Sequence, residues 1–217
     1  MKSFLKKVYR KFYKLFNNAP LNNKYRLRGT KLKNFGKSLY KCKFICNGSG
    51  NEIILYAGGT IRNTTFYING NNNIIEIGAD SSIAEGDLYI EDDNNKIEIG
   101  DQTRMCGKIH LACTESKTIK IGNDCLFSSE IVFRTGDSHS LVDMEGNRIN
   151  SAADIELGNH VWVGYRALIN KGVYIAPNNV VGTGAIVTKK FEESNTVIAG
   201  VPAKVVKRNT NWVTQRI

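Results

Sequence analysis

Apolar residues recur along this chain with a period of six. Toward the C-terminus an aliphatic residue stands at every sixth position, namely Leu157, Val163, Ile169, Ile175, Val181 and Val187. A second, mostly small series lies two residues before these positions, namely Val161, Ala167, Val173, Asn179 and Ala185. A helix needs apolar spacings of three and four, and a single strand alternates by two, so neither explains a period of six. The pattern predicts a coil in which each six-residue unit forms one flat side and one corner.

The same signature appears upstream at a longer step. The segments "LYAGGTI", "IGADSSI", "IGDQTRM" and "IGNDCLF" begin at positions 55, 77, 99 and 121, three equal steps of 22 residues. Three sides close a turn, and stacked turns bury their aliphatic residues against one another as parallel strands. Glycines follow the aliphatic position at 78, 100, 122, 158, 164 and 182. We expect these glycines to supply positive φ at the corners.

The period breaks over residues 134–153, which contain "RTGDSHSLVDMEGNRIN" and one of only three histidines in the chain. A column of stacked coils offers flat faces and few concave pockets, so chemistry requires a projecting element. We therefore expect a protruding loop here.

The segments "LGNHVWVGYRALINKGVYIAPNNVVGTGAIVTKKF" and "VIAGVPAKVVKRN" resemble the hexapeptide-repeat acyltransferases. The resemblance covers roughly residues 53–208. It implies an all-β, left-handed parallel β-helix, a homotrimer with active sites between subunits, and acetyl-CoA as co-substrate. The expected domains are a basic arm over 1–50, the β-helix over 51–190 with its active-site loop at 134–153, and a C-terminal tail over 191–217 that completes the coenzyme A site.

In the family, a loop at this point carries a histidine that acts as general base, and His139 occupies the matching position. Imidazole suits this task because its pKa lies near neutrality. Asp137, Asp143 or a backbone carbonyl would fix its tautomer. The resemblance also places Trp162 at the active-site groove, where its indole N–H would stabilise an oxyanion; burial of this ring between subunits explains it equally well.

Small and basic residues near the end of the coil are candidates for the coenzyme A site. Small residues let a ligand approach the backbone, and basic residues meet phosphates. The candidates are Gly164, Gly182, Thr183, Gly184, Ala185, Lys189, Lys190, Ala199, Gly200, Lys204, Lys207 and Arg208.

Apolar residues also stand immediately before the inward positions, namely Trp162, Leu168, Tyr174, Val180 and Ile186. We expect this outward run to be covered, either by a trimer interface or by one of the chain's own ends. His110, His139 and His160 are separated by 29 and 21 residues and lack the H-x4-H pair of a related zinc-dependent hydratase class. The sequence therefore predicts no metal site.

The positive charge is concentrated at the N-terminus. Residues 1–51 hold 14 Lys and Arg and no acid, although the whole chain has 30 basic and 20 acidic residues. Residues 1–18 predict an amphipathic helix that either lies on an anionic membrane or caps the first coil. The body has no nucleic-acid recognition motif. The five cysteines match no zinc spacing, which favours a reducing compartment. We expect a cytoplasmic protein, with peripheral contact at the inner face of the membrane if the arm binds lipid.

The sequence thus predicts an O-acetyltransferase that acts on a sugar hydroxyl of a capsular or surface polysaccharide or its precursor. An N-acetyltransferase of amino sugars and a xenobiotic acetyltransferase are alternatives within the fold. A zinc-dependent hydratase and a non-catalytic β-helix are alternatives of other classes.

Overall fold

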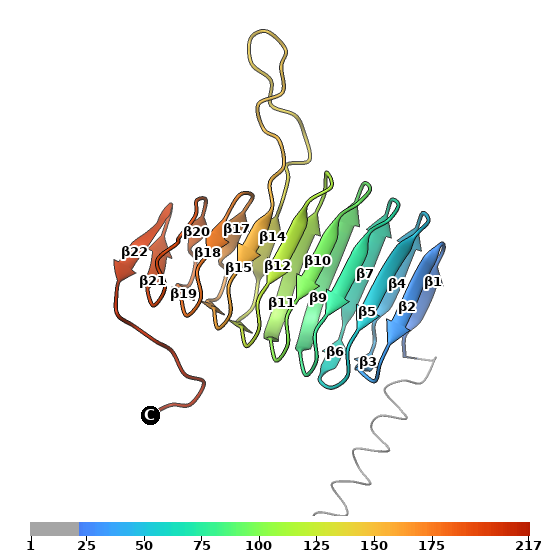
Figure 1. Ribbon diagram of the computed structural model, residues 1–217, viewed down its shortest axis with the longest axis horizontal. Coiled ribbons are helices and arrows are strands. Elements are labelled where there is room, and N and C mark those ends of the chain that lie inside the picture. Colours follow the sequence, from blue (N-terminus) through green and yellow to red (C-terminus); the bar gives the residue numbers. More distant parts are fainter. Residues whose placement is uncertain (1–21) are drawn as a thin grey trace, which may run out of the picture.

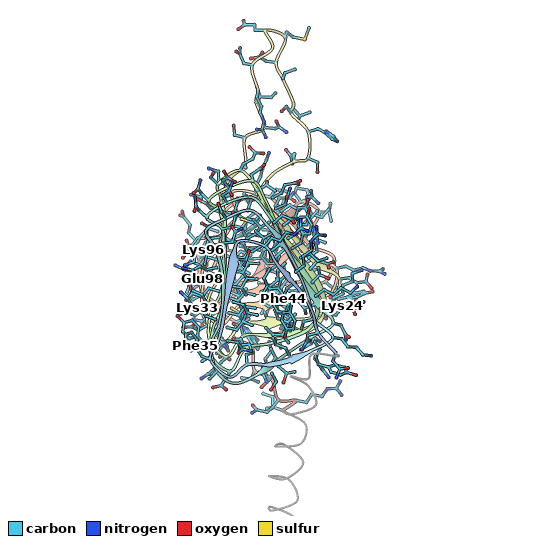
Figure 2. All side chains as sticks on the ribbon, turned by 90° about the vertical axis from the view of Figure 1, so that its right-hand side faces the viewer. Lys24, Lys33, Phe35, Phe44, Lys96 and Glu98 are labelled. Carbon is cyan, nitrogen blue, oxygen red and sulfur yellow. The ribbon has the colours of Figure 1, made fainter. Side chains whose placement is uncertain are left out.

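Both period-six series point into the core. The computed structural model describes residues 22–217, and every member of the two series is buried, including the polar Asn179. The described residues form a column of stacked coils with a triangular cross-section (Figures 1 and 2). Nearly all strand pairs are parallel, because each coil repeats the path of the one before it.

The column has three faces. The first face is a seven-stranded sheet of β2 (Thr30–Asn34), β5 (Asn51–Leu55), β8 (Ile74–Ile77), β10 (Lys96–Ile99), β12 (Thr118–Ile121), β15 (Ile155–Leu157) and β18 (Tyr174–Ile175). The second face holds β3 (Ser38–Tyr40), β6 (Thr60–Arg62), β13 (Leu126–Phe127), β16 (Trp162–Val163), β19 (Val180–Val181), β21 (Val197–Gly200) and the antiparallel β22 (Ala203–Lys207). The third face holds β1 (Lys24–Leu27), β4 (Lys43–Asn47), β7 (Thr64–Asn69), β14 (Ile131–Arg134), β17 (Leu168–Asn170) and β20 (Ile186–Val187). The long strands β9 (Ser82–Glu91) and β11 (Arg104–Cys113) bend from the second face into the third and join them in one sheet.

The column is left-handed, as the resemblance implied. Figure 2 views it from its N-terminal end, with Lys24 on the third face at the right and Lys33 on the first face at the left. The chain climbs the third face, crosses the upper corner, descends the first face past Phe35 and returns along the second face. It therefore turns anticlockwise as it recedes. We call the upper corner, between the third and first faces, the loop corner.

The column begins earlier than the boundary at residue 51 that the sequence suggested. Strands β1 to β4 belong to it, with Lys24 paired with Lys43 and Lys43 paired with Thr65. The first step is 19 residues instead of 22, and the exposed side chains of β1 are mostly basic, which hides the repeat. The predicted helix over residues 1–18 lies outside the described residues. No helix among residues 22–217 is long and apolar enough to cross a membrane.

The repeat glycines are required for a different reason from the one predicted. None of the six glycines that follow the aliphatic positions has positive φ. Instead, a Cβ on Gly100 would lie 2.6 Å from the carbonyl carbon of Gly122, and one on Gly122 would lie 2.6 Å from that of Gly158. At the corner between the first and second faces, successive coils therefore approach too closely for a side chain at these glycine positions.

Lys37 is buried completely at the corner between the first and second faces. Its Nζ donates hydrogen bonds to the carbonyl oxygens of Gly58, Gly78 and Ser81, at 2.8, 2.9 and 3.0 Å. Burial lowers the pKa of this amine to about 8, against the opposing charge of Asp80. The ammonium form therefore predominates at neutral pH and supplies one donor to each carbonyl.

Replacing Lys37 with Met should destabilise the protein, because two buried carbonyls and one part-buried carbonyl would lose their donor. An unsatisfied buried polar group costs about 1–3 kcal/mol, and we expect a total loss of about 3 kcal/mol in urea unfolding. Lys33→Met is the control, since it removes only the exposed pair with Glu52 and should cost less than about 1 kcal/mol. Equal losses for the two variants would contradict the assigned role.

Candidate functional site

The interrupting segment is a protruding loop, as predicted. It leaves the column at the loop corner, between the end of β14 and the start of β15, and extends well beyond every other corner (Figure 1). Its far end is a two-stranded turn in which Val142 pairs with Arg148. Asp143 stabilises this turn by accepting hydrogen bonds from the backbone N–H groups of Glu145 and Asn147, at 2.9 and 2.8 Å.

His139 lies on the outgoing arm of this loop and is exposed. Its carbonyl oxygen accepts a hydrogen bond from Asn150 Nδ2 at 2.8 Å, which ties the two arms together. No described residue of the same chain forms a hydrogen bond with the imidazole ring. Both ring nitrogens of His139 are therefore available to groups from outside the chain.

Asp137 is engaged at the base of the loop. Its Oδ2 accepts hydrogen bonds from Lys171 Nζ at 2.6 Å and from Asn150 Nδ2 at 2.9 Å. The Lys171 ammonium, and then Asn150, hold the pKa of this carboxyl below its ordinary value. Asp137 thus anchors the loop to the column. In the structure of residues 22–217 its carboxylate forms no hydrogen bond with the His139 ring. Its predicted role in orienting His139 stays a prediction.

A second ion pair fixes the returning arm. Arg148 donates from Nη1 and Nη2 to the two carboxylate oxygens of Glu115, at 2.8 and 2.7 Å. This two-point contact is the strongest geometry available to the pair. Asn150 Oδ1 then accepts from the N–H of Leu141 at 2.8 Å. The loop therefore stands as a braced arm that presents His139 away from the core.

Trp162 lies on the second face, directly opposite the loop corner. It pairs in register with Leu126 and Val180, and it is 40% exposed. In a triangular column the loop corner and the second face lie on opposite sides, as the end view shows (Figure 2). One chain therefore keeps His139 and Trp162 apart.

The outward apolar run does not form one strip. Trp162 and Val180 lie on the second face, Leu168 and Ile186 on the third, and Tyr174 on the first. The run occupies all three faces because steps of six residues move around the triangle while steps of 18 move along it. Its cover by a trimer interface stays a prediction.

Trp212 in the C-terminal tail was not predicted, and it packs beside Trp162. The two ring centroids are 6.2 Å apart. Trp212 also stacks in parallel on the His160 ring at 4.1 Å and donates from Nε1 to the His160 carbonyl at 2.9 Å. The His160 ring makes two further contacts, with Nδ1 at 2.9 Å from Asp124 Oδ2 and Nε2 at 3.2 Å from the Trp212 carbonyl. We call this set of contacts between His160 and Trp212 the clasp. His160 thus holds the tail against the second face. A cover by one of the chain's own ends was an alternative that the sequence offered, and the tail provides it in part at Trp162.

The coenzyme A candidates fall into separate groups. Gly164, Gly182 and Ala199 succeed one another along the second face, where a Cβ on Gly164 would lie 2.8 Å from the backbone nitrogen of Thr183. Thr183, Gly184 and Ala185 form the next corner, with Gly184 at positive φ. This row of small residues begins beside Trp162.

The basic candidates lie in two places. Lys189 and Lys190 follow β20, near the loop corner, and are exposed. Lys204 and Lys207 are exposed on β22, and Gly200 ends β21 beside it. Arg208 is paired with Glu193 at 3.0 Å and is not free. Within one chain, only Lys204 and Lys207 on β22 lie near the row of small residues, because β22 pairs with β21.

The three histidines lie apart, with His110 on the third face, His139 on the loop and His160 at the corner before β16. Among residues 22–217, no group of three or more His, Cys, Asp or Glu side chains is placed to hold a metal ion.

The chain is similar to several sugar acetyltransferases. It is 36% identical to a polysialic acid O-acetyltransferase of Escherichia coli O1:K1 over 100 residues, which cover 46% of this chain and 32% of that protein. It is 33% identical to the galactoside O-acetyltransferase of Escherichia coli K12 over 98 residues, covering 45% and 48%. The chain thus spans about a third to a half of the length of these curated relatives. No protein-family model matches it.

Two solved structures match over nearly the whole chain. The structure of the polySia-specific acetyltransferase NeuO is 30% identical, with a TM-score of 0.80, covering 89% of this chain and 88% of that one. The structure of the polysialic acid O-acetyltransferase OatWY is 30% identical, with a TM-score of 0.55 and 90% coverage of both. The column, the interrupting loop and these matches define a left-handed β-helix transferase fold. The chain belongs to the hexapeptide-repeat acyltransferases.

The anchors of the loop should persist until the pH falls below the ordinary carboxyl values of 3.8 for Asp137 and 4.5 for Glu115, because both pKa values are lowered in the folded protein. We expect hydrogen-exchange protection of the Leu141 and Ile149 amides to be constant from about pH 7 to 5 and to fall below about pH 4. Lys171→Met should reduce this protection already at pH 7, with Lys189→Met as control. Unchanged protection in Lys171→Met would contradict the anchoring role.

The clasp predicts that His160 shields Trp212. In a Trp162→Phe background Trp212 is the only tryptophan, so its fluorescence reports on the tail alone. Replacing His160 with Ala should shift this emission to the red and expose the ring to acrylamide, because the stack and the contact of Nε2 with the tail are lost. A ring that stays shielded would show that the tail docks without His160.

Proposed function

We propose that the protein is an acetyl-CoA-dependent O-acetyltransferase that acylates a hydroxyl group of a capsular or surface polysaccharide or its precursor. The observation that carries this proposal is the match to the polySia-specific acetyltransferase over 88% of that chain. It is supported by a braced loop that presents a histidine whose ring has no partner among the described residues.

In the proposed reaction, His139 removes the proton from the acceptor hydroxyl as its oxygen attacks the thioester carbonyl. The tetrahedral intermediate carries one negative charge on the former carbonyl oxygen, and the Trp162 indole N–H donates to it. Collapse breaks the carbon–sulfur bond, and the protonated His139 returns its proton to the departing thiolate. The products are an acetyl ester and coenzyme A.

The separation of His139 and Trp162 favours a site shared by two copies. Since the loop corner lies opposite the second face, the His139 of one chain reaches a Trp162 only on a neighbour. In a cyclic arrangement each loop contacts the next second face and all sites are equal, and three is the number of subunits that the resemblance implies. We therefore propose a homotrimer with its sites between subunits and coenzyme A along the row that runs from Gly164 to Ala199. Five cysteines without a disulfide among the described residues suit a cytoplasmic location.

The proposal is tested by thiol release from acetyl-CoA with a panel of glycans and amino sugars. We expect acceptor-dependent release, reduced about 10²- to 10⁴-fold in His139→Ala. Ser140→Ala, the adjacent exposed position, is the control and should retain activity. Release that is indifferent to His139→Ala would remove this residue from the mechanism. Release that depends on an amine alone would assign N-acetylation instead.

The shared site is tested by complementation in trans. His139→Ala and Trp162→Ala should each be inactive alone, and their co-expression should restore activity. With equal amounts and random assembly, about a quarter of the interfaces combine an intact His139 with an intact Trp162. Recovery near a quarter of the wild-type rate is expected. No recovery, in assemblies shown to contain both variants, would place both residues of each site on one chain or outside it.

A further inference from the structure

A pocket of about 540 Å³ lies on the third face, directly beneath the protruding loop. Its lining comes from β9, β11, β14, the corners that follow β9 and β11, and the base of the loop. The lining includes Asp137 and Ser138, which directly precede His139. Its volume falls in the range of about 300–1,000 Å³ that is usual for small-molecule sites.

The pocket lies where one row of outward side chains contains a buried alanine. Along this row Ile45 is in register with Tyr67, Tyr67 with Tyr89, Tyr89 with Ala112, and Ala112 with Arg134. Tyr89 and Arg134 therefore flank a position where the side chain is a single methyl group.

One side of the pocket is aromatic. The Tyr67 and Tyr89 rings stack at 4.8 Å with an interplanar angle of 3°, which fixes the orientation of Tyr89. The His110 ring lies 6.2 Å from that of Tyr89, and burial lowers its pKa, which favours the uncharged form of the ring. An aromatic face carries partial negative charge and attracts the C–H groups on one face of a saturated, otherwise polar ring.

The wall is polar and carries more negative than positive charge. The carboxylates of Glu115 and Asp137 are neutralised by Arg148 and Lys171. Two further carboxylates line the pocket and form no ion pair with a described residue, namely those of Glu91 and Asp92. Glu91 accepts a hydrogen bond from the Tyr89 hydroxyl at 2.6 Å, which raises the pKa of that hydroxyl to about 12.

Arg134 is the single cation among the pocket residues, and its Nη2 donates to the Ser138 hydroxyl at 3.1 Å. The wall thus offers acceptors for hydroxyl groups and one donor, with a small excess of negative charge. It would repel a sugar that carries a carboxylate.

We propose that this pocket binds a neutral pyranose ring of the acceptor glycan, with the C–H face of the sugar on Tyr89 and its hydroxyls on Glu91, Asp92 and Arg134. This proposal rests on the proposed function, because it treats the glycan as the acceptor that His139 deprotonates. A sugar in this pocket contacts Ser138, the residue before His139. The pocket therefore selects which sugar ring of the glycan is presented to His139.

The test is a binding measurement that requires no catalysis. The chain has three histidines, so the ring proton of His110 is resolved by NMR and reports on the pocket directly. The probes are methyl α-glucopyranoside, methyl β-galactopyranoside and the methyl glycoside of N-acetylneuraminic acid. A neutral pyranoside should shift the His110 signal, and the carboxylated sugar should shift it less at equal concentration.

Variants separate this pocket from other sugar contacts. Ala112→Leu fills the hollow and should weaken the neutral pyranoside at least about tenfold, since one misplaced methylene in a pocket is worth about 10- to 200-fold. Tyr89→Ala should do the same, whereas Tyr89→Phe keeps the ring and should retain binding. Thr65→Leu, on the same face but outside the lining, is the control for adding bulk to this sheet.

The outcomes are distinguishable from those of the proposed function. No His110 shift with either neutral pyranoside, or a shift that survives Ala112→Leu, would overturn the pocket assignment. A stronger shift with the carboxylated sugar would overturn the neutral class. Coenzyme A binding, measured separately, decides the transferase proposal and is expected to be unchanged in Ala112→Leu.

Discussion

Each coil of this protein completes its hydrogen bonds only through the coils beside it. The N–H of Gly78 donates to Ile99, that of Gly100 to Ile121 and that of Gly122 to Leu157, at 2.7, 2.8 and 2.9 Å. The two partners are 21 residues apart in the first two bonds and 35 in the third, where the loop is inserted, yet the length of the bond hardly changes. The pairing register within the column is therefore strict, and the insertion of a long loop at one corner does not change it. This separation lets a rigid scaffold hold a long functional loop.

The interior of the column is not uniformly apolar, and its polar members follow the same rule. Asn51, Asn73 and Asn95 are buried one above another, each accepting a hydrogen bond from a backbone N–H of the next coil, at 2.9, 2.8 and 3.0 Å. Lys37 performs the converse task with three donors. These side chains pair the backbone groups that each corner leaves unpaired, so they help to specify the register as well as to stabilise it.

The sequence predicted the inward residues, the left-handed column by resemblance, and the position of the loop. It did so because burial inside a repeat imposes a period that survives in a single chain. It missed β1 to β4, where a 19-residue step and basic outward side chains obscure the period. It did not show that His139 and Trp162 lie on opposite sides of one column, because that placement depends on the three-sided path of the chain and on the direction in which the loop projects. The clasp of His160 and Trp212 joins segments 52 residues apart and leaves no periodic signal. The pocket depends on Ala112 standing between two large side chains of adjacent coils, which only the register reveals.

The reversal of direction at the last coil has a consequence for assembly. A column of parallel strands ends in an exposed edge that invites another copy to continue the stack. Here β22 turns back and pairs antiparallel with β21, carrying Lys204 and Lys207 on its exposed side. On the second face, a further coil cannot join this edge with the parallel register used inside the column. The same strand that adjoins the row of small residues therefore also acts as a terminator that limits growth into fibres.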